Sequence, residues 1–439
     1  VLMRRMFTWQ QIPKMMELKA LLEAAVAQHP EWPAAERGNL LGECDLIQSF
    51  LFYNDITQMS RLHRSASRQM SRPAVTLRNS GSWTFGSPSV LMMYYRAPGE
   101  LGKELAEMYE CMPHYYKITN GHGRGAELLM DAEAAYLQGA WEKAAVLLER
   151  ARADAAGQEN MTLCCDFLAL RLALCGKGKE GYDFAAKRAA LLQKHDGVQV
   201  HLLESIAAYF YALQGRPEQA PELFREHKLA EVSFFGPCRP MMSLIEQQVW
   251  LAQGEYVKVI AHSEGLLRRC EAMHYGLVGL QARIQLAAAQ LRFGQRAEAR
   301  ATLAAALLDA VQDDFWVLFV EQYPALAPLL EGEDWAVCEP RLGPFVARIL
   351  PAGRAFAARP ADPRAGAAPD RPRPGAGPSG GRAVHQQGDR RRPLPLRGHG
   401  EAVHQPAVRK AGYGRRPPHP PRPAGRVVPE KRPPELTKN

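Results

Sequence analysis

Apolar residues recur at helical spacing along the chain up to about residue 350. Four apolar runs, AEAAYLQ, AAYFYALQ, QVWLAQ and LAAAQLRF, are each followed by a glycine and then by a second amphipathic segment. Residues 1–75 show a similar pattern, with Pro30 and Pro33 between two amphipathic stretches at a predicted helix boundary. The pattern predicts an all-α fold.

The glycines mark an internal repeat. The segments GAWEKAAVLLERA, GRPEQAPELFREH, GEYVKVIAHSEGL and GQRAEARATLAAA begin at Gly139, Gly215, Gly254 and Gly294, and a weaker copy, GKGKEGYDFAAKR, begins at Gly176. Successive glycines lie 37, 39, 39 and 40 residues apart. Glycine can end the first helix of each unit because it adopts the left-handed conformation at no steric cost.

Small and bulky residues follow these glycines at fixed distances. A small residue follows the glycine by five positions in three of the repeats, and a bulky residue follows it by nine positions. The pairs are Ala144 and Leu148, Ala220 and Phe224, and Ala299 and Leu303. The spacing resembles the G-x-[YW]-x-x-A-x-x-x-[FL] core of tetratricopeptide-like repeats, whose usual period is about 34 residues. Such units bury their faces by stacking, which predicts an α-solenoid over residues 85–335. A helical segment over 1–84 precedes it, and a linker helix over 336–358 follows.

Charge and cysteine usage narrow the function classes. The net charge is +9, but residues 351–439 alone hold 19 Lys and Arg against 6 Asp and Glu. The rest of the chain is therefore slightly acidic and gives no sign of a nucleic-acid surface. The eight cysteines form no C-x-x-C pair, and Cys164, Cys165 and Cys175 are interpreted as small buried apolar residues. We find no signal peptide or long apolar run, which favours a reducing cytoplasm and no membrane. The first residue, Val1, suggests a missing front end.

The motifs of common enzyme classes are missing from the sequence. There is no G-x-x-x-x-G-K-[ST], H-E-x-x-H or G-x-S-x-G, and helical Glu and Asp residues are interpreted as solvated faces. We therefore predict that the chain is not an enzyme, and we assign no catalytic, cofactor-binding or metal-binding residue.

Two irregular stretches, residues 79–101 and 114–129, mix aromatic residues with glycine and polar groups near helix starts. They could line a groove for a ligand or partner. The alternative is that these side chains pack between repeats, with His122 of GHG as a turn residue. The candidate groove residues are Trp83, Phe85, Tyr94, Tyr95, Tyr115, Tyr116 and His122.

The C-terminal 89 residues contain 18 prolines and read as a disordered Pro/Arg-rich tail over 359–439. An Arg-rich nucleic-acid-binding arm is one alternative. A frame error in a GC-rich gene is another, and the genetic code favours it.

With one base dropped, the codons of residues 386–413 permit N-[KR]-E-I-A-A-A-L-F-L-S-E-G-T-V-K-x-[YF]-I-N-x-L-F-E-K-L-G. This reading is similar to the helix-turn-helix of LuxR-type transcription regulators. We place the slip at about residues 350–369.

The upstream chain, with GSWTFGSPSV, YECMPHYYKITNGHG and GAWEKA, resembles the sensor region of MalT-like LuxR-family regulators. The resemblance implies an upstream NTPase domain that binds ATP, an inducer or regulatory protein on the solenoid, and promoter DNA at the helix-turn-helix. As written, the chain has neither the NTPase nor an in-frame helix-turn-helix. The resemblance therefore implies a signal-sensing region that has lost DNA binding. The alternative is a stand-alone protein-interaction adaptor with a disordered basic tail.

These expectations predict where protease resistance ends. The folded region should stop near residue 350, because the residues beyond it show no apolar period. Limited proteolysis followed by mass spectrometry measures this limit. A resistant fragment reaching well past residue 370 contradicts the prediction.

Overall fold

The repeat glycines turn the chain between helices, as the sequence predicts. The computed structural model describes residues 1–77, 81–178, 181–194 and 196–359. Within it, all five repeat glycines have a left-handed backbone, with φ between +69° at Gly215 and +92° at Gly294. A side chain at such a position strains the backbone, so the glycine period marks where one helix ends and the next begins.

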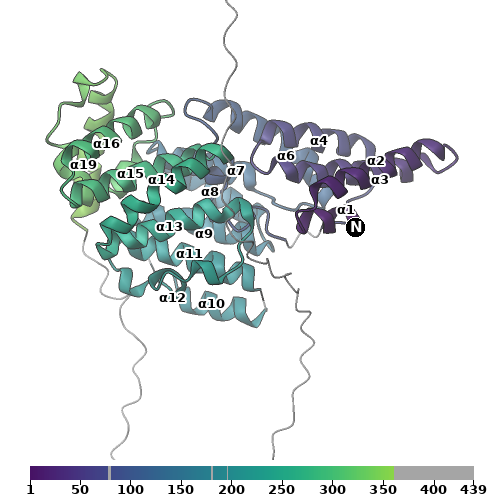
Figure 1. Cartoon of the computed structure of the whole chain (residues 1–439), viewed down its shortest axis with the longest axis horizontal. Coiled ribbons are helices and arrows are strands. Elements are labelled where there is room, and N and C mark those ends of the chain that lie inside the picture. The colour runs from purple at the N-terminus through teal and green to yellow at the C-terminus, as the bar shows by residue number, and fades with distance from the viewer. Residues whose placement is uncertain (78–80, 179–180, 195, 360–439) are drawn as a thin grey trace, which may run out of the picture. The chain divides into compact units, whose positions relative to one another are not determined.

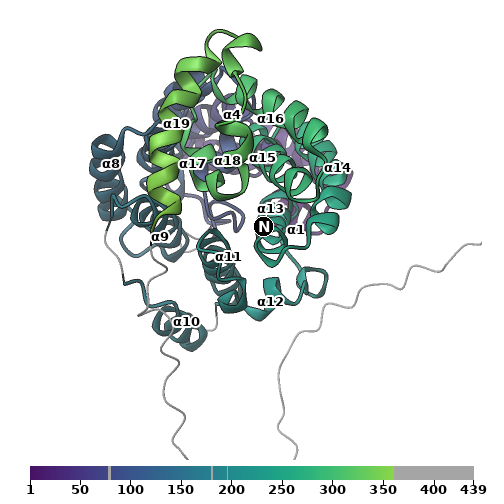
Figure 2. The same ribbon diagram turned by 90° about the vertical axis from the view of Figure 1, so that its left-hand side faces the viewer.

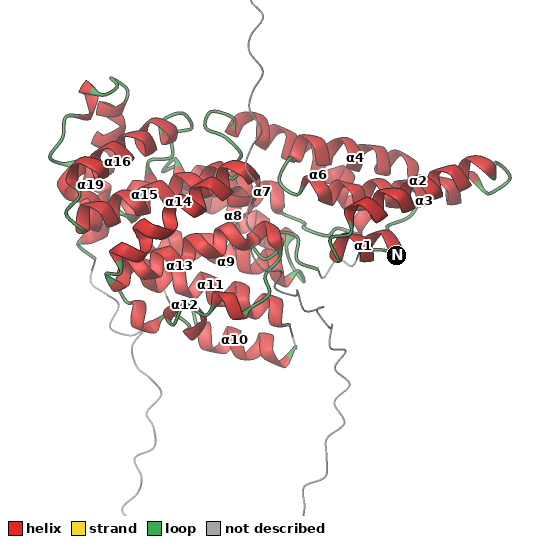
Figure 3. Ribbon diagram, in the orientation of Figure 1, coloured by secondary structure: helices red, strands yellow, loops and turns green. Residues whose placement is uncertain are grey.

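The described residues form α-helices, short 3-10 turns and loops, with no strand among them (Figure 3). The α-helices are α1 (Leu2–Thr8), α2 (Ile12–Gln28), α3 (Ala34–Ser49), α4 (Ile56–Gln69), α5 (Val90–Tyr94), α6 (Leu101–Thr119), α7 (Ala126–Leu137), α8 (Trp141–Asp154), α9 (Glu159–Leu174), α10 (Phe184–Gln193), α11 (Gly197–Leu213), α12 (Glu222–Arg225), α13 (Arg239–Gln253), α14 (Tyr256–Met273), α15 (Gly276–Arg292), α16 (Arg296–Ala310), α17 (Val317–Glu321), α18 (Tyr323–Leu330) and α19 (Leu342–Ala357).

Consecutive helices pack as pairs, among them α3 with α4, α7 with α8, and α15 with α16 (Figure 1). The small residues predicted to let helices approach are buried, as are the bulky ones predicted to fill the space between pairs. They are Ala144, Ala220, Ala299, Leu148, Phe224 and Leu303. The first helix of a pair is buried on more sides than the second. In α15, for example, Leu280 is buried on one face, and Val278 and Ala282 are buried on another.

One repeat departs from the prediction. The segment GRPEQAPELFREH should supply a second helix, but it forms only a 3-10 turn (Pro217–Gln219) and the four-residue α12. Pro221 has no backbone N–H and disfavours helical geometry at the residue before it. Ala220 accordingly has φ −58° and ψ 144°. Two prolines thus override the apolar spacing, although Ala220 and Phe224 are still buried.

The N-terminal residues are helical, as predicted, and α1, α2 and α3 enclose a small separate core of Met3, Met15, Cys44 and Ile47. The predicted boundary at residues 84 and 85 lies in the loop between α4 and α5. The predicted linker helix corresponds to α19, which continues past residue 350 to Ala357. The predicted disordered tail and shifted-frame helix-turn-helix fall at residues 360–439, outside the described residues.

The C-terminal helices pack against helices from earlier in the chain. Figure 2 shows α17 and α18 close to α15 and near α9 and α11. Within this group, α17 contacts α7, and α18 contacts α15. The Trp316 indole Nε1 donates to the Gln138 carbonyl at 2.8 Å, just beyond the end of α7. The Arg359 guanidinium donates to the carbonyls of Ala173 and Leu174, at the end of α9. Residues 313–359 therefore join the C-terminal helices to the ends of α7 and α9.

Two repeat glycines provide a matched test of the contact between Trp316 and the end of α7. A Cβ on Gly139 would overlap the Trp316 ring, whereas a Cβ on Gly294 would meet nothing within 4 Å. We expect Gly294→Ala to lower the free energy of unfolding by about 1–2 kcal/mol, through backbone strain alone. We expect Gly139→Ala to cost about 1–3 kcal/mol more, because it also overpacks the core. Urea denaturation measures both values, and equal losses would contradict the packing of Trp316 on Gly139.

Candidate functional site

A charged pair lies buried where α17 meets α9. Arg171 and Glu321 are 150 residues apart in the chain, and their side chains are 3% and 1% exposed. The guanidinium binds both carboxylate oxygens, with Nε at 2.8 Å from Oε1 and Nη2 at 3.1 Å from Oε2. This two-point geometry is the strongest that arginine and a carboxylate can form. It fixes the end of α17 against α9.

Two tyrosine hydroxyls complete the environment of the Glu321 carboxylate. Tyr136 of α7 donates to Oε1 at 2.7 Å, and Tyr209 of α11 donates to Oε2 at 3.3 Å. The Arg171 guanidinium carbon lies 4.7 Å from the centroid of the Tyr136 ring and 5.5 Å from that of Phe167. We call Tyr136, Arg171 and Tyr209 the carboxylate cradle. Its members come from three different helices, α7, α9 and α11.

The electrostatics of the cradle follow from its burial. Burial alone lowers the pKa of Arg171, but the facing Glu321 carboxylate outweighs it and holds that pKa well above its ordinary value. Burial also raises the pKa of Tyr136 and of Tyr209 well above the ordinary tyrosine value. Both hydroxyls therefore stay protonated and act as donors, and the arginine stays charged.

Four buried glutamines extend the polar interior toward α13 and α15. Gln281 Oε1 lies 3.2 Å from the Tyr209 hydroxyl and shares its single hydrogen with Glu321. Gln285 and Gln322 both donate to the amide oxygen of Gln248, at 3.0 and 2.5 Å. Residues of α11, α13, α15 and α17 are thus linked through amide and hydroxyl groups. Such a network is strong only when each member is satisfied, because an unpaired polar group is costly in a low dielectric.

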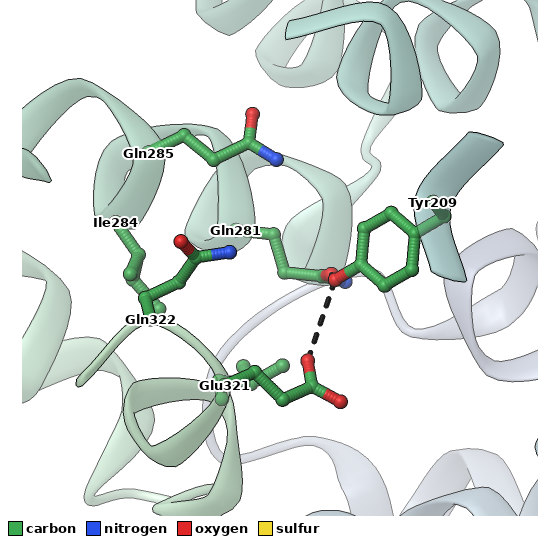
Figure 4. A pocket seen from close by; sticks show the side chains of 7 residues that line it. Tyr209, Gln281, Ile284, Gln285, Glu321 and Gln322 are labelled. Atoms are coloured by element: carbon green, nitrogen blue, oxygen red, sulfur yellow. Dashed lines mark hydrogen bonds between the residues drawn. The ribbon is translucent and has the colours of Figure 1, made fainter. Parts of the chain in front are cut away.

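A small pocket adjoins the cradle, and two of its polar atoms lack partners. Its empty volume is about 190 Å³, part of it open to solvent. The side-chain Nε2 of Gln281 and Oε1 of Gln285 have no hydrogen-bond partner. Figure 4 shows these side chains with Tyr209 and Glu321 around the space. We call this space the glutamine pocket; it is lined by Tyr209, Gln281, Ile284, Gln285, Leu318, Glu321 and Gln322.

Most of the sequence-predicted groove residues lie inside the protein instead. Trp83, Tyr94, Tyr95, Tyr115 and His122 are buried, whereas Phe85 and Tyr116 are half-buried. This burial favours the alternative in which the aromatic side chains pack between helices. As they stand, the five buried side chains do not line an open groove.

The structure brings part of this aromatic set together. The Trp83 ring lies 5.1 Å from that of Tyr94, and the Tyr115 hydroxyl bonds to Nδ1 of His122 at 2.8 Å. Nε2 of His122 lies 3.1 Å from the Gly81 carbonyl, and burial lowers the pKa of His122 to about 4. His122 is therefore a neutral side chain that ties the loop before α7 to residue 81.

Tyr95 and Tyr116 serve other contacts. Tyr95 donates to Asp313 Oδ2 at 2.6 Å and so helps to hold the segment that leads into α17. The Tyr116 hydroxyl bonds to Glu127 and donates to the Gly123 carbonyl at 3.2 Å. The seven predicted residues therefore do not form one site.

The interpretation of helical acidic residues as solvated is wrong for several of them. Glu104, Glu133 and Glu321 are all buried. Burial raises the pKa of Glu104 to about 8 and that of Glu133 to about 7. The sequence contained one usable signal for the cradle, because Arg171 is a lone basic residue in the apolar run FLALRLALC. The partner of that arginine had no local signal.

The described ranges hold no group of three or more His, Cys, Asp or Glu side chains that could bind a metal ion. No helix within them is long and apolar enough to cross a membrane. Comparison with protein-family models, with curated proteins and with solved structures found no match for this chain. The cradle and the glutamine pocket therefore have to be interpreted from their own chemistry.

Breaking the buried pair should destabilise the fold strongly. We expect Arg171→Met or Glu321→Gln to lower the free energy of unfolding by about 3–5 kcal/mol, because each leaves a buried partner uncompensated. The double variant Arg171→Met with Glu321→Gln should lose less than the sum of the two. A double-mutant cycle by urea denaturation measures the coupling. The exposed pair Arg268 and Glu264 on α14 is the matched control, and it should show little coupling.

Proposed function

We propose that this chain is the signal-sensing region of a MalT-like, LuxR-family transcription regulator, built as a tetratricopeptide-like α-solenoid and acting in the cytoplasm without catalysis. The observation that carries the proposal is the polar interior. Side chains from α7, α9, α11, α13 and α15 converge on Glu321, Gln322 and the glutamine pocket. A site assembled from several repeats responds as a unit when one contact changes.

The glutamine pocket is where a small-molecule inducer would act, and a regulatory protein could act on the same helices from outside. Two unpaired amide atoms in the pocket offer one donor and one acceptor to such a ligand. Binding there would alter the contacts of Tyr209 and Glu321 and hence the hold on α17.

Residues 313–359 are the route by which such a change would leave the sensor. Four of these residues, Asp313, Trp316, Glu321 and Arg359, bind residues from earlier in the chain. Their partners are Tyr95, Gln138, Arg171 and Ala173 respectively. Loosening any of these contacts shifts the position of α19, which leads into residues 360–439. In the proposed regulator, promoter DNA is a partner only when the helix-turn-helix is restored in frame.

The gene sequence tests this proposal directly. We expect a single-base change before residue 386 to restore the E-I-A and T-V-K motifs in frame, and we expect codons for a P-loop domain upstream of Val1. The frame-restored protein should then bind DNA with an affinity that falls steeply with salt, whereas the chain as written should not.

The opposite result would remove the regulator assignment. If the frame stands and no P-loop is encoded upstream, the chain is better described as a stand-alone adaptor of helical repeats. Its residues 360–439 would then need study as a functional basic segment, starting with nucleic-acid binding at low salt.

A further inference from the structure

Glu321 is held as an anionic ligand would be held. The two guanidinium contacts and the two tyrosine hydroxyl contacts to its carboxylate all come from other helices. The donors lie on α7, α9 and α11. A side chain that only capped its own helix would instead bond to nearby backbone groups. All the donors of the cradle therefore come from outside the segment that fills it.

The chemistry of the cradle selects a carboxylate. A guanidinium presents parallel N–H groups that match the two oxygens of a planar carboxylate, and two hydroxyls add one donor to each oxygen. Tyr136, Arg171 and Tyr209 are all at least nine-tenths buried. A buried arginine demands a negative partner, because an uncompensated charge in the interior is costly. Any anion that replaces Glu321 must provide the same two oxygens.

We propose that the carboxylate cradle is the binding site of a small organic acid, whose carboxylate takes the place of the Glu321 carboxylate. This inference rests on the sensing function proposed above and names the ligand class. The glutamine pocket gives access, since Tyr209 and Glu321 line it from the cradle side. The closed part of this pocket has room for about one water molecule, so the acid has to occupy the space that the Glu321 side chain leaves.

The glutamine pocket is too small to hold the displaced Glu321 side chain, which therefore has to leave the cradle together with α17. The unpaired Nε2 of Gln281 is a donor on the wall that Glu321 shares, and the unpaired Oε1 of Gln285 accepts from a hydroxyl or amide of the incoming acid. Glu321 is the last residue of α17, so its exchange releases α17 from α9. Ligand binding is thereby coupled to the segment that runs on into α19.

Rescue by acetate tests the proposal. Glu321→Ala in the full chain leaves Arg171 without its partner, and we expect a lower melting temperature than that of the unsubstituted chain. Added sodium acetate at pH 7 should raise that temperature by at least about 2 °C in a saturable manner, because only the folded state binds it. Sodium chloride at equal ionic strength should not raise the melting temperature, because chloride lacks the two planar oxygens. Acetamide should not raise it either, because acetamide is uncharged.

Two variants control for general salt effects. Glu264→Ala removes an exposed carboxylate from an ion pair on α14, so its response to acetate should equal its response to chloride. Arg171→Met combined with Glu321→Ala removes the guanidinium, so the acetate response should vanish. An acetate effect of equal size in all three variants overturns the proposal, and so does a folded Glu321→Ala chain that acetate does not stabilise beyond chloride.

Hydrogen exchange on the unsubstituted chain decides the matter if Glu321→Ala does not fold. Saturating acetate should speed exchange at the amides of residues 317–322, relative to chloride, while the amides of α14 stay unchanged. Identical exchange in the two salts overturns the proposal. Neither result of the exchange measurement affects the gene-sequence test of the sensing function. If acetate has no effect, the proposed function remains as a sensor for an uncharged ligand.

Discussion

The buried pair of Arg171 and Glu321 is the contact on which the arrangement of the helix pairs depends. Each charge is removed from water, so neither can remain without the other. Because the two residues lie on α9 and α17, this requirement holds α17 against a helix far earlier in the chain. Trp316 over Gly139 and Arg359 on the end of α9 strengthen the same closure. Without the pair, the C-terminal helices would keep the peripheral hydrogen bonds of Trp316 and Arg359 but would lose the buried polar contact between α17 and α9.

The polar interior also gives the closure its specificity. Apolar side chains would bury as much area without demanding one geometry, whereas the Glu321 carboxylate accepts from Tyr136, Arg171 and Tyr209 only in one position. The adjoining glutamine pocket is the place where this network is incomplete. A site that is nearly satisfied can change state with a small ligand. In the sensor proposed above, the response would begin in this interior rather than at the outer helices.

Local features of the fold were predictable, and distant ones were not. The glycine at the end of each first helix and the small residue five positions later have local steric causes, and residues such as Gly254 and Ala299 behave as expected. The prediction of a second helix after Gly215 was wrong because Pro217 and Pro221 break it. The aromatic residues of 79–101 and 114–129 were noticed for their composition. Their burial depended on which helices cover them.

The sequence by itself determined that this chain is helical, where its helices turn, and which small residues lie between them. These properties follow from the conformational freedom of glycine and from apolar spacing, both of which act between near neighbours. Only the tertiary structure decided that Arg171 meets Glu321 and that the Gln281 and Gln285 amides face a shared pocket. Helical spacing describes the faces of one helix at a time. The partner of a buried charge is set by how successive pairs are stacked, which places residues 150 positions apart in contact.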